Sequence, residues 1–397
     1  MTGGDVYDVA VVGLGGLGSA TAWQAARRGK RVLGLERFSL GAHHHGATHG
    51  DTRIIRLSYH TPAYVAAAME TYQDWSALET DCGEPLVERT GGVDLFPVGA
   101  AIEVEDYVDS MTAMGVPYEV LPAAVARGRW PGLAVPDGTT VVFQDRTGIA
   151  PPSRGVQAMQ AQATRFGADL RGDQQVVELA DLAGEAVSLR TADGERYLAR
   201  RVVVAADAWT NDVLASLDAS VPLTVTKEQT VHFAVGDGDE DGRGGTHSFG
   251  AFPVWIWMDD PSYYGFPSFR EASVKVAQDC GGLPVDPDAR TFEPDREMLA
   301  RTQAFVRDLV PGAGDVLRVS TCLYTLTPDR DFVVDRVPGH DNVVVGLGAA
   351  HGFKFAPWFG RVLADLATTG STSSDIGAFT MTRRALTDPD APQTWLV

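Results

Sequence analysis

The stretch "YDVAVVGLGGLGSATAWQAARRGKRVLGLER", residues 7–37, has the pattern of a short apolar strand, a glycine-rich turn, a helix and a second apolar strand. Gly13, Gly15 and Gly18 form the spacing G-x-G-x-x-G, and Glu36 follows the second strand. Such glycines let the backbone approach a pyrophosphate at the helix N-terminus, and the carboxylate accepts hydrogen bonds from a ribose. The alternative is a turn that only packs a helix on a strand. The complete set favours a βαβ unit that binds a dinucleotide.

The apolar run inside this stretch, residues 9–26, approaches the length of a membrane span. Four glycines interrupt it, and Asp5 and Asp8 precede it, where a signal peptide carries positive charge. We therefore expect it to be neither a signal peptide nor a membrane anchor.

The composition is that of a globular protein with a sizeable core, since 44% of the 397 residues are hydrophobic. The 52 acidic residues outnumber the 33 Lys and Arg residues, and the net charge of −19 disfavours binding to nucleic acids or anionic membranes. The three cysteines, Cys82, Cys280 and Cys322, are widely spaced, which indicates neither a disulfide framework nor a zinc site. A reduced, cytoplasmic setting is expected.

The dinucleotide unit does not continue directly, because residues 46–60 are polar and cationic where an NAD-type sheet usually adds its next βαβ repeat. Further pieces of the same type return at residues 197–214 and 341–370, each a strand that leads through small residues into a helix. Strand-like segments lie between these pieces, at residues 91–97, 229–235 and 252–258. This order predicts a discontinuous Rossmann-like domain and a second domain that contains a sheet.

Four motifs carry a family resemblance: "GDTRIIR" (50–56), "YYGFPSF" (263–269), "TCLYT" (321–325) and "HGFKF" (351–355). In this order behind the glycine fingerprint, they make the chain resemble the monomeric sarcosine oxidase and N-methyltryptophan oxidase family over nearly its whole length. The resemblance implies FAD as the cofactor and an α/β fold like that of glutathione reductase and D-amino-acid oxidase.

The expected domain division follows from the same resemblance. The FAD-binding domain is assigned residues 1–85, 147–218 and 318–397, and the substrate-binding domain residues 86–146 and 219–317.

Cys322 is implied by the resemblance to carry FAD through a thioether to the 8α-methyl carbon of the flavin. The simpler alternative is a small buried hydrophobic residue, the usual fate of a cysteine. A thioether would raise the reduction potential of the flavin and favour hydride transfer from an amine. The expected contacts to the cofactor are Gly13, Gly15, Gly18, Glu36, Arg37, Thr52, Arg53, Val177, Cys322 and Lys354.

Arg56 and Lys354 are implied to hold the carboxylate of an amino-acid substrate, because a guanidinium fork and an ammonium group both bind this anion. Arg53 is placed near the flavin. The alternative is that both arginines lie on an exposed face of a helix or strand and form ion pairs with acidic residues at the surface. Lys354 interrupts the apolar run "GFKFAPWFG", where a lysine without a function is uncommon.

Lys275 alternates with Val274 and Val276, which indicates a strand, and the resemblance implies that it faces inward and activates dioxygen. Tyr264 and Tyr324 match tyrosines that line the family's pocket, with core packing as the alternative. His49 matches a histidine near the flavin.

The consecutive histidines at 43–45 look like a metal tract, but neighbours in an extended segment cannot all face one ion. We therefore expect no metal and place them at the rim of the FAD loop.

Two positions depart from the family pattern. Trp255 stands where sarcosine oxidase has a methionine, and Asp279 where it has a histidine. We expect Trp255 to narrow the cavity or to stack on an aromatic substrate, and Asp279 to pair with a substrate ammonium group. Together, the two departures favour a substrate bulkier or more rigid than sarcosine.

The predicted function is FAD-dependent oxidation of a secondary or cyclic amino acid to an imine that hydrolyses, with dioxygen reduced to hydrogen peroxide. The alternatives are a biosynthetic oxidase of a cyclic imine or specialised amino acid, and a flavin dehydrogenase that passes electrons to a carrier. A catalytically silent flavin-binding module is a third, non-enzyme reading. The expected partners are the substrate and dioxygen, with no nucleic acid or membrane, and the chain is expected to be a monomer.

Overall fold

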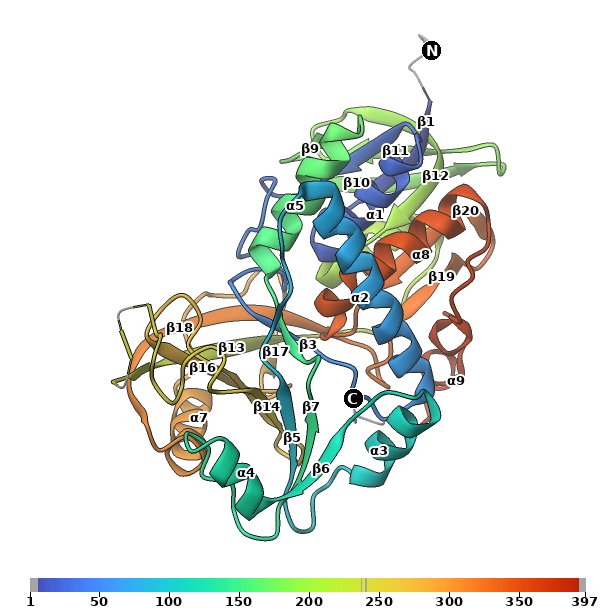
Figure 1. Ribbon diagram of the computed structural model, residues 1–397. Coiled ribbons are helices and arrows are strands. Elements are labelled where there is room, and N and C mark those ends of the chain that lie inside the picture. Colours follow the sequence, from blue (N-terminus) through green and yellow to red (C-terminus); the bar gives the residue numbers. More distant parts are fainter. Residues whose placement is uncertain (1–5, 237, 240, 393–397) are drawn as a thin grey trace.

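Two large β-sheets organise the chain, one in the upper and one in the lower part of Figure 1. The structure is a computed structural model that describes residues 6–236, 238–239 and 241–392. The upper sheet has eight strands: β1 (Tyr7–Val12), β2 (Val32–Leu35), β9 (Asp169–Arg171), β10 (Val176–Leu182), β11 (Ala186–Thr191), β12 (Arg196–Val204), β19 (Val333–Val337) and β20 (His340–Leu347). Its backbone order is β10-β11-β12-β1-β2-β9, and β20 pairs with β12 and β19.

The βαβ unit predicted from residues 7–37 is confirmed. β1 pairs in parallel with β2, and α1 (Gly16–Arg27) connects them. A Cβ atom added to Gly18 would lie 1.8 Å from the carbonyl oxygen of Gly13, so only glycine lets α1 start this close to the strand. The pieces predicted at residues 197–214 and 341–370 also join this sheet, as β12 and β20, both parallel to the central strands.

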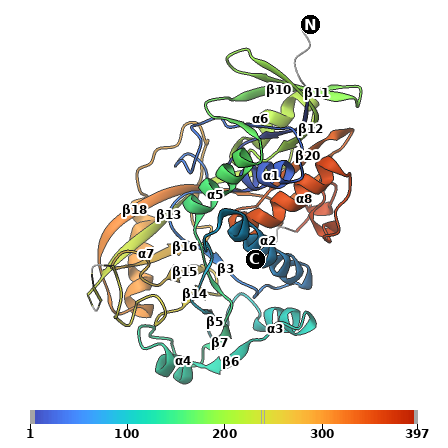
Figure 2. The same cartoon turned by 45° about the horizontal axis from the view of Figure 1, so that its top comes forward.

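The lower sheet has nine strands: β5 (Gly92–Phe96), β6 (Glu119–Pro122), β7 (Thr140–Gln144), β13 (Thr224–Val235), β14 (Val254–Trp257), β15 (Tyr263–Phe266), β16 (Ser273–Gln278), β17 (Leu283–Pro284) and β18 (Ala313–Leu326). The long antiparallel pair β13 and β18 crosses the molecule in both ribbon views (Figures 1 and 2). A small third sheet contains β3 (Arg53–Ile55), β4 (Glu88–Arg89) and β8 (Gly148–Ala150).

Helices α1, α5 and α8 pack side by side against the upper sheet, and α2 lies on α5 and α8 (Figures 1 and 2). The helices of the described residues are α1 (Gly16–Arg27), α2 (Pro62–Cys82), α3 (Val104–Ala113), α4 (Ala123–Arg129), α5 (Pro152–Arg165), α6 (Thr210–Leu214), α7 (Arg296–Leu309), α8 (Ala356–Thr368) and α9 (Arg384–Thr387). None of these helices is long and apolar enough to cross a membrane.

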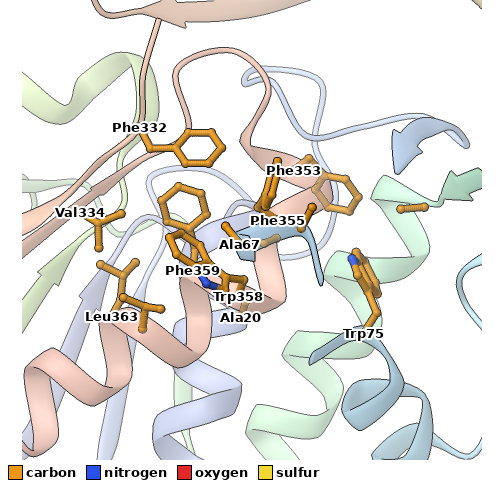
Figure 3. Packing of buried hydrophobic residues seen from close by; sticks show 14 of the residues in the cluster. Ala20, Ala67, Trp75, Phe332, Val334, Phe353, Phe355, Trp358, Phe359 and Leu363 are labelled. Atoms are coloured by element: carbon orange, nitrogen blue, oxygen red, sulfur yellow. The ribbon is translucent and has the colours of Figure 1, made fainter. Parts of the chain in front are cut away.

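An aromatic core anchors the start of α8. Figure 3 shows Phe332, Phe355 and Phe359 clustered close together, and the ring centroids of Phe332 and Phe359 lie 4.9 Å apart. The 3-10 turn η3 (Gly352–Phe355) that leads into α8 is held by this core. The indole Nε1 of Trp75, on α2, donates a hydrogen bond of 2.8 Å to the carbonyl oxygen of Lys354. The packing therefore fixes the backbone at Lys354.

The division expected at residue 318 falls inside β18, which pairs with β13 on both sides of that point, from Ala313 to Leu326. One hydrogen-bonded strand is not divided between two domains, and we propose that this boundary lies after Leu326. The ends of the expected FAD-binding domain, residues 1–5 and 393–397, lie outside the described residues.

Candidate active site

A cavity of about 500 Å³ is lined by residues from the upper and lower sheets and from the turns between their strands. It brings together residues that the sequence places more than 300 positions apart. Of the predicted site residues it is lined by Gly13, Gly15, Glu36, Arg37, Arg53, Arg56, Tyr264, Asp279, Tyr324 and Lys354.

The glycine turn forms one part of this cavity and fits a dinucleotide pyrophosphate. Gly13 has φ +87°, and a Cβ atom there would lie 2.5 Å from the carbonyl oxygen of Ala205. A Cβ atom on Gly15 would meet only the hydroxyl of Thr48, at 4.0 Å, so the backbone of the turn is open to the cavity. Gly15 caps α1 without a side-chain hydrogen bond, which leaves the first N–H groups of the helix available to an anion.

Glu36 lies at the same end, at the carboxyl end of β2. Its carboxylate accepts hydrogen bonds from the backbone N–H groups of Leu14, at 2.7 Å, and Phe38, at 3.0 Å. A carboxylate has about four lone-pair sites, so it retains capacity for a ribose hydroxyl. The glycine turn and the carboxylate of Glu36 together fit FAD.

Arg37 and the segment around Val177 flank this end of the cavity. Arg37 forms an ion pair of 2.9 Å with Asp288, and its guanidinium lies 5.1 Å from the centroid of the Trp209 ring. Val176 lines the cavity, whereas Val177 sits at a register shift between β10 and β11 and is not among the lining residues.

Arg56 follows β3 and is 5% exposed. Its Nη1 lies 3.3 Å from Oδ1 of Asp94, and its guanidinium lies 4.7 Å from the centroid of the Tyr59 ring. Burial lowers the pKa of Arg56, but Asp94 together with Tyr107 and Tyr59 raises it by more, so the pKa is raised overall and the guanidinium stays charged. Burial raises the pKa of Asp94, with Arg56 opposing. Sequence reasoning missed Asp94, although a single acid inside the apolar strand "GVDLF" is a signal for a buried partner.

Lys354 shares the cavity with Arg56 and Asp279. Burial, and then the neighbouring charge of Arg56, lower the pKa of Lys354 to about 7, with Asp279 opposing. The hydroxyl groups of Tyr264 and Tyr324, which also line the cavity, lie 3.3 Å apart and can share a hydrogen bond. Among the groups that line the cavity are therefore the cations of Arg56 and Lys354, the carboxyl group of Asp279 and the hydroxyl groups of the two tyrosines.

Trp255 does not line this cavity, which corrects the expectation from sequence. It is fully buried in the core of the lower sheet, where its ring centroid lies 6.1 Å from that of Phe305 on α7. On β14 and β15, Ile256 pairs with Tyr264, and Trp255 pairs with Gly265. Cross-strand partners share a face, so Ile256 points into the cavity with Tyr264, and the indole occupies the space beside Gly265 on the other face.

Replacing Trp255 by phenylalanine should leave the order of substrate preference unchanged, because the side chain contacts core residues and not the cavity. Replacing it by alanine should lower the free energy of unfolding by about 3–5 kcal/mol, the usual cost of a large buried cavity. Ile256→Ala is the matched control from the other face of the same strand, and it should change the substrate order. The measurements are kcat/KM across a substrate panel and chemical denaturation, and a reordered panel for Trp255→Phe would contradict this placement.

A second cavity of about 290 Å³ is lined by four further predicted residues, His49, Thr52, Lys275 and Cys322, and by Arg53. Gly18, like Val177 and Trp255, lines neither cavity. Lys275 is 6% exposed, and its Nζ donates hydrogen bonds of 2.8 Å to both the carbonyl oxygen and the hydroxyl of Thr52. Burial, and then Arg53, lower the pKa of Lys275 well below its usual value. The inward orientation expected for this lysine agrees with its burial.

Cys322 and His49 line the same cavity. Burial raises the pKa of the Cys322 thiol to about 11, with the charge of Arg53 opposing. Burial, and then Arg53, lower the pKa of His49 to about 3, and its Nε2 atom has no hydrogen-bond partner among the described residues. Arg53, Lys275 and Arg318 are the basic side chains of this lining, and Asp51 and Glu271 are its acids.

The side chains of the three consecutive histidines, at positions 43–45, contact different groups. His43 approaches Glu36 at 3.3 Å, His45 stacks on Phe38 with centroids 4.1 Å apart, and His44 lies beside His49. Within residues 6–236, 238–239 and 241–392, no group of three His, Cys, Asp or Glu side chains could hold a metal ion.

Cys280 lines the first cavity next to Asp279. No role in the site is predicted for this cysteine from the sequence. Its φ of +49° turns the chain after β16, and its thiol lies 3.7 Å from Oδ2 of Asp279. No pattern in the sequence predicts that a cysteine adopts a positive φ at this position.

Comparisons with known proteins agree with this geometry. A family model for FAD-dependent oxidoreductases matches residues 8–366. A monomeric sarcosine oxidase from Streptomyces avermitilis is 35% identical over 388 residues, which cover 96% of this chain and 98% of that protein. An N-methyl-L-tryptophan oxidase from Yersinia pestis is 32% identical over 383 residues, which cover 95% of this chain and 99% of that protein.

One solved structure resembles this chain over nearly its whole length. It is the open form of NikD, an unusual amino acid oxidase essential for nikkomycin biosynthesis, with a TM-score of 0.82, 31% identity and 99% coverage of both chains. The predicted fold class and family are therefore confirmed. The chain belongs to the FAD-dependent oxidoreductase family, in the group of amine oxidases that includes monomeric sarcosine oxidase and N-methyltryptophan oxidase.

Proposed function

We propose that this chain oxidises a secondary or cyclic amino acid to an imine, with dioxygen as the electron acceptor and hydrogen peroxide as the second product. The observation that carries the proposal is the meeting of Arg56, Lys354, Asp279, Tyr264 and Tyr324 in one cavity. The relatives named for sarcosine and N-methyltryptophan support an N-methyl amino acid as the substrate class. We further propose a monomer in the cytoplasm.

FAD would be held by the glycine turn and Glu36 at one end of the first cavity, and by a thioether from Cys322 at the other end of the site. When bound, FAD supplies a two-electron acceptor for hydride from a carbon next to the substrate nitrogen. Arg53 lines both cavities, and we place its positive charge beside the cofactor.

Arg56 and Lys354 bind the substrate carboxylate in this proposal. Asp94 keeps Arg56 in position, and a carboxylate that reaches Lys354 stabilises the ammonium form of a group whose pKa is about 7. Asp279 lines the same space and suits a substrate amine or hydroxyl, whereas a second substrate carboxylate there would be repelled. The two tyrosines supply hydrogen bonds on the facing wall.

Lys275 stabilises the negative charge that develops on dioxygen. The lysine is buried with Thr52 in the second cavity, where the low dielectric strengthens such an interaction. His49 stays neutral beside it because its pKa is about 3.

The affinity for a substrate carboxylate should fall as the pH rises through about 7. The pKa of Lys354 is lowered to about 7, so the cation is present below this pH and is lost above it, whereas Arg56 stays charged. A charge-assisted hydrogen bond contributes about 1.5–3 kcal/mol, so the dissociation constant should rise about tenfold or more. Propionate, which carries no amine, can be titrated against flavin absorbance from pH 6 to 9. Lys354→Met should flatten the profile, and an affinity that rises with pH would contradict the assignment.

A biosynthetic oxidase that acts on a specialised amino acid is the second candidate. The likeness to NikD at 31% identity and the presence of Asp279 in the cavity favour it. Such an enzyme would share the cofactor site and differ in the substrate it accepts.

A peroxide assay on the purified yellow protein, with sarcosine, N-methyl aromatic amino acids, proline and pipecolate, tests the proposal. Peroxide formation with one of these amines under air is the expected result. Reduction of the flavin by an amine without peroxide would indicate a dehydrogenase that uses a carrier. Absence of flavin reduction by the whole panel would favour the specialised substrate or a silent flavin-binding module.

A further inference from the structure

The second cavity leads from the surface to Lys275. Its lining includes Lys275 and Cys322, which are 6% and 4% exposed, and also Glu271 and Arg318, whose side chains are 37% and 44% exposed. Among the described residues, Arg53 is shared by the linings of the two cavities. A small solute or a proton can therefore approach the lysine without passing through the space that holds Arg56 and Lys354.

His232 lies between the exposed and the buried parts of this cavity. On the lower sheet it is directly opposite Lys275 of β16 on one side and Arg318 of β18 on the other. Residues opposite one another on paired strands share a face and have Cβ atoms about 4.5–5.5 Å apart. The imidazole is thus the neighbour of the buried lysine and of the exposed arginine.

A carboxylate orients this imidazole. Nδ1 of His232 lies 2.6 Å from Oε1 of Glu271, and the same oxygen accepts hydrogen bonds from Ser273, at 2.5 Å, and Arg318, at 2.8 Å. Burial raises the pKa of Glu271, but Ser273 and Arg318 outweigh it, so the pKa is lowered overall and the carboxylate stays ionised. An ionised acceptor requires the proton on Nδ1, which leaves the lone pair on Nε2.

Reduction of dioxygen at Lys275 needs a proton from solvent. The balance is FADH⁻ + O₂ + H⁺ → FAD + H₂O₂, in which two electrons and one proton leave the reduced cofactor and the second proton enters from outside. Lys275 can donate this proton because its pKa is lowered, but its hydrogen bonds to Thr52 bring no proton back. A proton carrier between Lys275 and the surface completes the cycle.

We propose that His232, oriented by Glu271, carries protons between solvent and Lys275 through the second cavity. The inference rests on the proposed reduction of dioxygen at Lys275. The groups that face the imidazole are Lys275, Arg318, Glu271 and Ser273. Burial, and then Lys275 and Arg318, lower the pKa of His232 to about 4, with Glu271 opposing, so at neutral pH Nε2 is free to take up a proton and pass it on.

The test is the rate at which dioxygen reoxidises the reduced flavin, followed by stopped-flow absorbance in weakly buffered solution. His232→Ala and His232→Gln should each slow this step at least tenfold with little effect on anaerobic reduction by substrate. Added imidazole should restore the rate of His232→Ala, because the cavity then admits a substitute carrier. His340→Gln is the matched control, since His340 forms a comparable pair with Asp181 in the upper sheet and lines neither cavity.

A second measurement does not depend on turnover. Histidine NMR of the holoenzyme, with His232 assigned from His232→Gln, should show its pKa rising in Lys275→Met and falling in Glu271→Gln. Normal reoxidation in both His232 variants, a slow variant that imidazole does not rescue, or an unchanged His232 pKa in Lys275→Met would each overturn the proton-carrier role. Normal reoxidation in Lys275→Met itself would instead overturn the proposed function.

Discussion

Replacing Lys275 by methionine is expected to slow reoxidation of the reduced flavin by about 10²–10³-fold, the usual cost of removing one preorganised charge from a buried site. Anaerobic reduction by substrate should change much less, because Lys275 lines the second cavity and the proposed carboxylate clamp lines the first. Stopped-flow absorbance of the flavin measures the two half-reactions separately.

Lys227→Met is the matched control for this experiment. Lys227 lies on β13 in the same sheet, but its Nζ donates to the carbonyl oxygen of Glu293 and the residue lines neither cavity. Its replacement should leave both half-reactions unchanged. An equal loss in the two half-reactions of Lys275→Met would assign the lysine to substrate positioning or to the fold.

Replacing Cys322 by serine is expected to abolish covalent attachment of the flavin. Wild-type protein precipitated with acid should give a yellow pellet, and Cys322→Ser should release the colour into the supernatant. Cys322 is 4% exposed and lines the cavity with Lys275 and Arg53; burial raises the pKa of its thiol, and the charges of Arg53 and Lys275 oppose this rise. The measurement is flavin absorbance in the pellet and in the supernatant.

Cys280→Ser provides the control, because Cys280 lines the other cavity and carries no flavin in this proposal. Its pellet should remain yellow. A colourless wild-type pellet would show that FAD is bound without a covalent link.

Motifs read from the sequence located most of the candidate site. Arg56, Lys354 and Asp279 line one cavity, and Lys275 and Cys322 line the other. The family resemblance pointed to these residues, and for Lys354 the surrounding apolar run was an additional local signal. Their roles in catalysis remain predictions until the variants above are measured.

The sequence alone was a poor guide to which face of a strand a side chain takes. Trp255 was expected in the cavity, yet its neighbour Ile256 points there, because β14 pairs Ile256 with Tyr264. Side chains alternate along a strand, so a shift of one residue exchanges core and cavity. An alignment of motifs does not determine this register, whereas the hydrogen bonds between strands do.

The sequence by itself determined the βαβ unit, because this unit depends on local requirements such as the tight contact of Gly18 with Gly13. The resemblance of its motifs indicated the family and FAD as the cofactor. Only the tertiary structure decided that Asp94 is the partner of Arg56 and that His232 and Glu271 lie beside Lys275. These partners are separated by up to 43 positions, Lys275 from His232, and meet through strand pairing and packing, which no local pattern encodes. The physical reason is that a buried charge needs a partner in space, and the fold, not the spacing along the chain, supplies it.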